Sequence, residues 1–228
     1  MIGGVKFPST IMDKIFSHLD KEWQDTHVGV NNGAFWYSKE LLENIVPKIK
    51  TKRGWCLINV ENQCQDDMIV FIHNNAHPEN YEWLKDYKNL ILVCSQPKTL
   101  NAMIEMFPKF HCIYIPLSID TTYVKQFKAK RKTKGTAFFG RLAKCPQSLL
   151  SDDGIDKLGD LPREDLLRTV AKYKKVYAIG RCALEAKCLG CQVISHEGEY
   201  EGVDFQLLDN KDIIPELQRL LNEIDCVV

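Results

Sequence analysis

The chain has 228 residues, of which 45% are hydrophobic and 26% are charged, a composition typical of a globular protein with a sizeable core. Thirty basic residues balance thirty acidic ones, so the zero formal charge excludes a general attraction to nucleic acid or anionic membranes, and such binding needs a local patch. No apolar run reaches membrane-spanning length and the first ten residues lack the pattern of a signal peptide, so we expect a cytoplasmic protein.

Two helical patterns open the first half of the chain. A Ser-Thr cap followed by apolar residues at helical spacing predicts a helix over 9–23, and a second capped pattern predicts a helix over 38–49. Pro47 lies near the end of the second pattern, where it limits or kinks the helix because proline has no backbone N–H to donate.

Short apolar runs bounded by polar turns then predict buried parallel strands. They cover 55–60, 68–73, 90–95 and 112–117. Residues 78–87 and 97–107 have helical patterns and supply the connections between these strands. Such alternation is typical of a doubly wound α/β sheet.

A basic stretch over 118–135 has little apolar content and predicts a linker. After it the alternation restarts, with predicted strands at 136–142, 175–180 and 191–196 and predicted helices at 162–173, 181–190 and 211–224. We therefore predict an N-terminal domain over 1–122 and a C-terminal domain over 123–228, with the final helix able to pack back toward the first domain.

Ligands of open parallel sheets bind beyond the carboxyl ends of the strands. In the second half this rule selects Gly140, Arg141 and Lys144 after one strand, and Gly180, Arg181 and Glu185 after another. In the first half it selects His73, Asn74 and Ser95. A glycine lets a ligand approach the backbone, a guanidinium can bind a phosphate with two hydrogen bonds, and a helix N-terminus adds partial positive charge. Together these features suit a nucleotide diphosphate.

Four stretches resemble the retaining, nucleotide-sugar-dependent glycosyltransferases of GT-B fold. "FFGRLAK" (138–144) is similar to the family strand that ends in Gly-Arg-Leu, and "ALEAKCLGCQVI" (183–194) is similar to its Glu-Ala signature. "VCSQPKTLNAM" with "IPLSID" (115–120) resembles the end of the family's first half, and "GGV" (3–5) resembles its glycine loop. The resemblance implies two Rossmann-like domains with parallel sheets and a cleft between them.

The resemblance also implies roles for individual residues. Arg141 and Lys144 would bind the donor diphosphate, Glu185 the ribose hydroxyls, and His73 the donor sugar or the departing oxygen. Gly140, Gly180 and Arg181 would line the donor site. Tyr177 stands where the family usually has a second glutamate, a departure that bears on donor-sugar binding and on activity.

Other patterns point to different chemistry. Cys182, Cys188, Cys191 and His196 can be written as a zinc series, but the predicted helix and strand positions do not form the short loop turns of structural zinc sites. "CLGC" ends a helix, whereas a redox pair begins one. The nine cysteines lie mostly in apolar segments, so we expect reduced thiols. The basic run 125–135 could bind nucleic acid or an anionic acceptor, or could be an exposed linker.

These observations favour a glycosyltransferase that moves a sugar from a nucleotide-diphosphate sugar to a small-molecule or glycan acceptor. The resemblance implies retention of anomeric configuration without a bound metal or other cofactor. A nucleic-acid acceptor stays open. A non-catalytic protein that binds a nucleotide or nucleotide sugar is the alternative. The chain lacks a Gly-x-Gly-x-x-Gly motif after a strand, which argues against a nicotinamide-dependent oxidoreductase.

Overall fold

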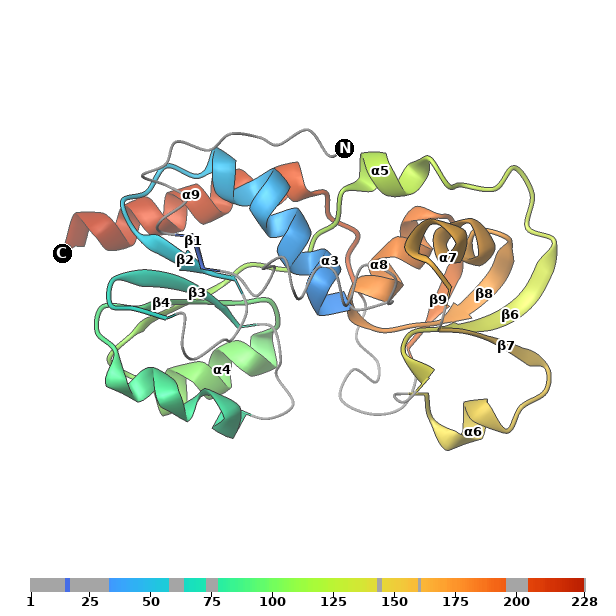
Figure 1. Cartoon of the computed structure of the whole chain (residues 1–228), viewed down its shortest axis with the longest axis horizontal. Coiled ribbons are helices and arrows are strands. Elements are labelled where there is room, and N and C mark those ends of the chain that lie inside the picture. The colour runs from blue at the N-terminus through green and yellow to red at the C-terminus, as the bar shows by residue number, and fades with distance from the viewer. Residues whose placement is uncertain are drawn as a thin grey trace.

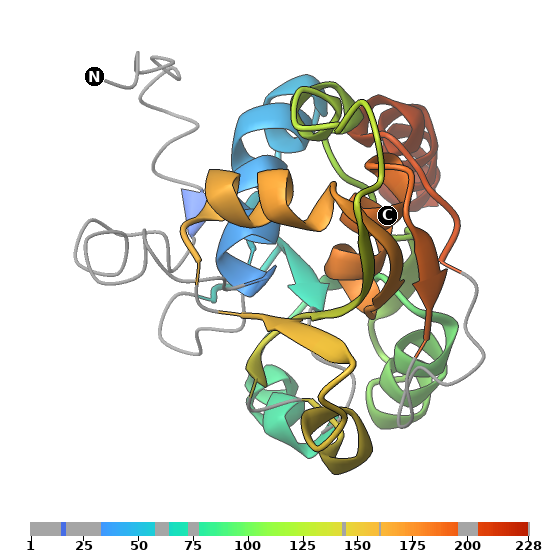
Figure 2. The same cartoon turned by 90° about the vertical axis from the view of Figure 1, so that its right-hand side faces the viewer.

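The computed structural model describes residues 15–16, 33–57, 64–72, 78–142, 145–159, 161–195 and 205–227. These residues form two sheets whose strands are all parallel, with helices packed against both (Figure 1). The view at right angles shows the second sheet with its helices toward the viewer (Figure 2). The α/β class and the parallel sheets predicted from the alternation of segments are therefore confirmed.

The first sheet has the strand order β1-β2-β3-β4-β5. Its strands are β1 (Ile15–Phe16), β2 (Gly54–Cys56), β3 (Met68–Ile72), β4 (Ile91–Cys94) and β5 (His111–Tyr114). Strands β2 to β5 overlap the four apolar runs that predict strands. The runs of β3 and β4 are continuously apolar because every residue in them is buried, on one face of the sheet or the other.

Helices cover both faces of the first sheet. They are α3 (Gly33–Glu40), η4 (Pro78–Asp86), α4 (Pro97–Met106) and α9 (Asn210–Val227). Successive side chains of a strand point to opposite faces, so Ile69 and Phe71 pack with residues of α9 and of the helical turns after α3. Val70 and Ile72 pack on the other face, with residues of η4 and α4.

Helix α3 continues into a π-helical turn, η1 (Leu41–Ile45), and a 3₁₀ turn, η2 (Val46–Lys48). The amide of Val46 donates to the carbonyl of Leu41, and Pro47 occupies the first turn of η2. Because Pro47 has no N–H, the α-helical pattern cannot continue through it. The helix predicted over 38–49 thus ends around Pro47, as expected. It begins earlier than predicted, at Gly33.

The second sheet has the strand order β7-β6-β8-β9. Its strands are β6 (Lys134–Phe139), β7 (Ile155–Leu158), β8 (Tyr173–Tyr177) and β9 (Gln192–Ile194). Its helices are α5 (Thr121–Lys125), α6 (Gln147–Leu150), α7 (Arg163–Val170) and α8 (Gly180–Cys188). Ala137 and Val176 pack against α7 and α8, whereas Phe138 packs in a smaller cluster with Ile155 on the other face.

The chain crosses between the sheets twice, and the two crossings lie side by side. Ile119 on the way out forms an isolated parallel β-bridge with Asp209 on the way back. Helix α9 then packs on the first sheet through Ile213, Leu217 and Leu221, all of which are buried. The last helix of the chain thus completes the core of the first sheet.

Several further elements differ from the sequence predictions, among them helix α6, which no pattern predicted. Residues Ile15–Phe16 lie in the predicted helix 9–23 but form β1, which pairs with Trp55 and Cys56 of β2; the pair combines a β-branched and an aromatic residue, which favour strands. Helix α5 occupies part of the predicted linker, where Asp120 caps it by accepting from the amide of Tyr123. Strand β7 was not predicted. In the described part of the chain, no helix is long and apolar enough to cross a membrane.

Candidate functional site

The strand order of the second sheet creates a point where neighbouring loops diverge. The connection after β6 leads to β7 on one side, whereas the connection after β8 leads through α8 to β9 on the other side. Phe138 of β6 is in register with Tyr177 of β8, so the residues that follow both strands emerge at one edge. Ligands of open α/β sheets bind at such a switch point.

Gly180 begins helix α8 at this edge. Its φ of +54° lies in the left-handed region, which glycine adopts without the steric cost that a side chain imposes. A Cβ placed on Gly180 would meet no atom of the described residues within 4 Å, so none of their side chains fills the space beside the helix start. Ile179, the N-cap residue, supplies no side-chain cap to the first turn. The first amides of α8 thus have no N-cap side chain to accept their hydrogen bonds.

Arg141 brings a cation to the same edge. It follows β6 and Gly140, and its side chain is exposed. Burial and the charge of Glu185 raise the pKa of the Cys182 thiol to about 12, against the opposing positive charges of Arg163, Arg181 and Arg141. Cys182 lies in the first turn of α8, so Arg141 adds positive charge on the side where that helix begins. The register of Phe138 with Tyr177 thus places Gly140, Arg141 and Gly180 at the same edge of the second sheet.

Glu185 lies one turn further along α8 and is fully buried, with an exposed fraction of 0%. Its Oε2 accepts from Nη1 of Arg163 at 2.7 Å, and its Oε1 accepts from Nε of Arg181 at 2.6 Å and also from Nη2 of Arg163. Burial alone would raise the pKa of Glu185, but the two guanidinium groups outweigh burial and hold it below its ordinary value. Both carboxylate oxygens are therefore already engaged.

Arg181 continues this network into the first sheet's helices. Its Nη2 donates to Oε1 of Glu40, at the end of α3. Burial alone would lower the pKa of Arg181, but Glu40 and Glu185 raise it above the ordinary value. Two arginines and two glutamates thus form a buried, neutral cluster between α3, α7 and α8.

The carboxylate of Glu40 also accepts hydrogen bonds from both segments that connect the two sheets. Its Oε2 accepts from the backbone amide of Asp120 on the outward crossing and from Nδ2 of Asn210 at the return, each at 3.0 Å. Oδ1 of Asn210 in turn accepts from the hydroxyl of Ser118 at 2.8 Å. Glu40 is only 8% exposed, so these bonds are shielded from water. One side chain therefore joins α8 to the two segments that connect the sheets.

Some donors of this cluster have no partner among the described residues. They are Nε of Arg163, Nη1 of Arg181 and the hydroxyl of Ser38. The guanidinium of Arg163 also lies over the ring of Trp36, 5.2 Å from its centre, a distance at which a cation is attracted to an aromatic face. The cluster thus contains buried N–H and O–H groups without a described hydrogen-bond partner, one of them on Arg181 in the first turn of α8.

The remaining predicted residues are placed differently. Tyr177, at the end of β8, packs with Phe138 and Cys145 on the sheet face away from α7 and α8. Lys144 and His73 lie outside the described residues, as do Asn74 and the glycines of "GGV". Ser95 follows β4 in the first sheet and is half-buried. The structure therefore does not bring Tyr177 to the same sheet face as Glu185.

Sequence reasoning missed Glu40, Arg163 and Asn210. A charged residue in an apolar helix such as "ALEAKCLG" needs a buried partner of opposite charge, and this was the signal that cations must surround Glu185. The partners themselves come from other elements. Arg163 is 22 positions away from Glu185, and Glu40 is 141 positions away from Arg181.

The cysteines of the zinc series do not converge. The thiol of Cys188 lies 3.7 Å from the carbonyl of Thr121, and that of Cys191 lies 3.4 Å from the carbonyl of Val170, while His196 lies outside the described residues. Among the residues that the structure describes, no three His, Cys, Asp or Glu side chains could hold one metal ion. All nine cysteines are free thiols.

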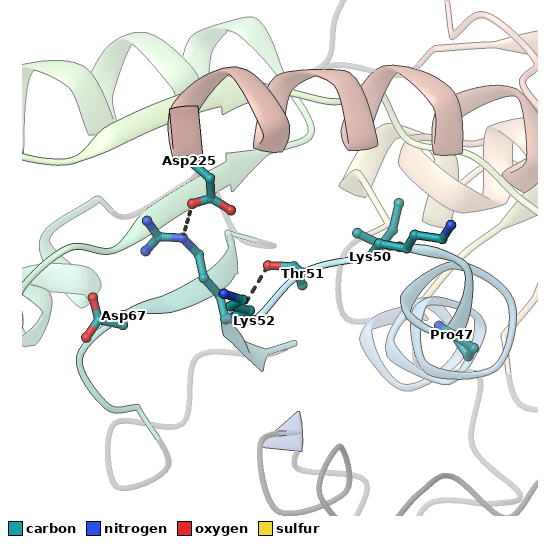
Figure 3. A pocket seen from close by; sticks show the side chains of 8 residues that line it. Pro47, Lys50, Thr51, Lys52, Asp67 and Asp225 are labelled. Atoms are coloured by element: carbon teal, nitrogen blue, oxygen red, sulfur yellow. Dashed lines mark hydrogen bonds and ion pairs between the residues drawn. The ribbon is translucent and has the colours of Figure 1, made fainter. Parts of the chain in front are cut away.

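A separate open pocket of about 900 Å³ lies at the first sheet, beside the residues that precede strands β2 and β3 (Figure 3). The segment 47–53 forms one wall, and Asp67 and Asp225 contribute carboxylates. Arg53, one of three cations that line the pocket, donates to Asp225 at 2.8 Å and to the carbonyl of Asn89 at 2.7 Å. The Arg53 guanidinium is therefore already paired with a carboxylate of the same chain.

No protein-family model matches the chain, and searches of curated proteins and of solved structures likewise gave no match.

Proposed function

We propose that the chain is a metal-independent glycosyltransferase that uses a nucleotide-diphosphate sugar, whose diphosphate binds at the diverging edge between β6 and β8. The observation that carries this proposal is the placement of Arg141 and of the start of α8, which has no N-cap side chain, at one edge of the second sheet. An anionic group there would accept from backbone amides and neutralise a guanidinium. The two sheets would then be the halves of a GT-B-like arrangement, with the acceptor approaching from the first.

The chemistry of transfer fits cations at this place. The bond between the anomeric carbon and the β-phosphate oxygen breaks, and the nucleoside diphosphate leaves with the bonding electrons. A new bond forms from the anomeric carbon to an acceptor hydroxyl oxygen, whose proton is released. Arg141 and the α8 amides would stabilise the growing negative charge of the leaving group, which is the main electrostatic demand of the step. Retention of configuration follows from the family resemblance.

Glu185 has a restricted role in this proposal. Its two oxygens accept three hydrogen bonds from Arg163 and Arg181, so it can bind a ribose hydroxyl only by giving up part of that pairing. We therefore assign it first to holding the two guanidinium groups behind the start of α8. Arg181 is itself buried and bonded to both Glu185 and Glu40, so the exposed Arg141 is the guanidinium that would bind the phosphate.

A second candidate is a non-catalytic protein that binds a nucleotide or nucleotide sugar at the same edge. Two observations favour it: Tyr177 packs on the far face of the sheet, and the carboxylate of Glu185 is fully engaged. Binding is common to both candidates, whereas release of nucleoside diphosphate from a sugar nucleotide occurs only in the enzyme.

Thermal unfolding with a panel of nucleoside diphosphates and sugar nucleotides tests the shared binding site. A ligand present at 100 times its Kd adds about 2.7 kcal/mol of stability, which raises the Tm of a protein of this size by about 5–10 °C. Arg141→Ala should weaken binding at least about tenfold, which is the loss of one charge-assisted hydrogen bond. Arg131→Ala is the matched control, because Arg131 is also exposed but precedes β6, at the other edge of the sheet.

Stabilisation by nicotinamide dinucleotides but not by nucleoside diphosphates would contradict both candidates. If a sugar nucleotide binds, an assay for its slow hydrolysis to the nucleoside diphosphate distinguishes the two candidates. Hydrolysis that is lost in Arg141→Ala supports the glycosyltransferase, and binding without hydrolysis supports the non-catalytic protein.

A further inference from the structure

Two separate stretches of the chain contain cations and no acidic residues. Between Asp120 and Asp152 there are eight Lys or Arg residues and no Asp or Glu. Between Asp165 and Glu185 there are five more, again without an acid. In a chain with equal numbers of acidic and basic residues overall, such segregation concentrates positive charge locally.

The fold brings these two stretches together at the start of β6 and β8. The amides of Thr133 and Lys134 both donate to the carbonyl of Lys172, at 2.9 and 3.0 Å, and Thr136 is in register with Lys175. This is the edge opposite to Arg141 and Gly180. The loop between α5 and β6 runs along the end of the second sheet that lies away from the first sheet (Figure 1).

Six exposed cations gather there, and we call them the cationic end: Lys128, Lys130, Arg131, Lys172, Lys174 and Lys175. None of the six has an ion pair or side-chain hydrogen bond to another described residue. Two neighbours are used structurally instead. Lys132 donates to the carbonyls of Ala171 and Leu189 at 2.8 Å each, and Lys134 pairs with Asp156. The six side chains of the cationic end therefore differ from Lys132 and Lys134, whose charges are engaged in contacts within the fold.

We propose that the cationic end binds the phosphate backbone of double-helical nucleic acid. Unpaired Lys and Arg side chains that repel one another in the free protein gain favourable partners, and release counterions, when they contact closely spaced phosphates. The surface offers charge without a groove-reading helix, so it holds a duplex without selecting its sequence.

The apolar side chains near this surface argue against other anionic partners. Phe127 packs edge-on against Tyr123, 5.2 Å between ring centres, and under Arg168 at 5.1 Å, so it is not free to stack on the bases of a single strand. The exposed large apolar side chains of the described chain are Ile104, Tyr114, Leu150, Leu161 and Leu207. None belongs to the cationic end, which therefore lacks the apolar anchors of bilayer-binding surfaces.

Fluorescence anisotropy with a labelled DNA duplex tests the proposal on the full chain. Binding at low salt should weaken as salt rises, with a slope of log Kobs against log salt of about −4 to −5 if most of the six cations contact phosphates. The triple variant Lys130→Gln, Arg131→Gln, Lys174→Gln should reduce that slope by about three and weaken binding at least about tenfold. Its Tm should stay unchanged, because the three side chains are exposed and unpaired.

The matched control removes the same charge from the first sheet's side, as Lys48→Gln, Lys50→Gln, Lys98→Gln, three exposed lysines. It should bind the duplex like the unaltered chain. The proposal is overturned if the duplex does not bind at about 50 mM salt, if both triple variants lose binding equally, or if the labelled single strand or vesicles containing anionic phosphatidylserine bind and the duplex does not. These outcomes do not depend on whether the chain transfers sugars.

Discussion

Glu40 at the end of α3 accepts a hydrogen bond from the guanidinium of Arg181 on α8, and this buried contact joins the helices of the two sheets. The other oxygen of the same carboxylate holds Asp120 and Asn210, one on each crossing between the sheets. A single ionised side chain is therefore shared by the candidate site and by both connections. Because its partners come from three parts of the chain, its removal affects all of them at once.

Replacing Glu40 by glutamine keeps the shape of the side chain but removes its charge. The buried cluster then contains two arginines and only one glutamate, and an uncompensated buried charge costs about 3 kcal/mol. We expect the free energy of unfolding, measured by urea denaturation, to fall by that amount. Glu43→Gln is the control, because Glu43 is exposed on the next turn and lies 4.0 Å from Lys39; its loss should be below about 0.5 kcal/mol. Equal effects of the two variants would contradict the assignment.

Arg163→Lys tests the fork that holds Glu185. Arg163 donates through both terminal nitrogens to the two carboxylate oxygens, whereas a lysine ammonium cannot make that parallel pair and fits the Trp36 ring less well. The free energy of unfolding should fall by about 2 kcal/mol. Arg168→Lys, an exposed substitution in the same helix with only surface pairs to Glu164 and Asp165, should change it by less than about 0.5 kcal/mol. Similar losses would show that the buried fork is not special.

The strands of both sheets could largely be predicted from the sequence, because buried parallel strands are continuous apolar runs. The run 68–73 predicts β3, Met68–Ile72, to within one residue. Strand β7, Ile155–Leu158, was missed because it is an edge strand whose middle residues, Asp156 and Lys157, are polar and not buried. A strand of two apolar and two charged residues cannot be distinguished from a loop by its pattern.

The edge of the candidate site could also be predicted, because strand-end glycines and cations follow from the local pattern. Gly140, Arg141 and Gly180 follow strands β6 and β8 at the same edge of the second sheet, whereas their role in binding stays a prediction. The pairing of Arg181 with Glu40 could not be predicted, since periodicity describes neighbours in the chain and not contacts across 141 positions. The same limit applies to the cationic end, where Lys172 joins Thr133 only through the register of β6 and β8.

The pH dependence of stability should report on Glu185. Burial opposes its ionisation, but Arg163 and Arg181 lower its pKa in the folded chain below the ordinary value. A group with a depressed folded pKa stabilises the fold above its unfolded pKa, which is about 4.3 for glutamate, and loses this contribution as the pH falls through the folded pKa. Urea denaturation should therefore show stability falling below about pH 5. Glu185→Gln starts less stable but should fall less steeply, and parallel curves would refute the prediction.

The two left-handed glycines at the ends of α8 separate a binding effect from a backbone effect. Gly180 and Gly190 have φ values of +54° and +78°, so alanine at either position is strained by about 1 kcal/mol. Both variants should lose similar stability in urea denaturation. Only Gly180→Ala adds a methyl group at the start of the helix, where a Cβ meets no atom of the described residues within 4 Å.

A diphosphate bound at that edge would meet this methyl group, so the Tm shift caused by a nucleoside diphosphate should shrink in Gly180→Ala. The shift should persist in Gly190→Ala, because Gly190 follows the far end of the helix, near Lys128. Isothermal titration of both variants gives the same comparison as a ratio of Kd values, with at least a tenfold increase expected for Gly180→Ala alone. Undiminished affinity in Gly180→Ala would contradict a diphosphate site at the start of α8.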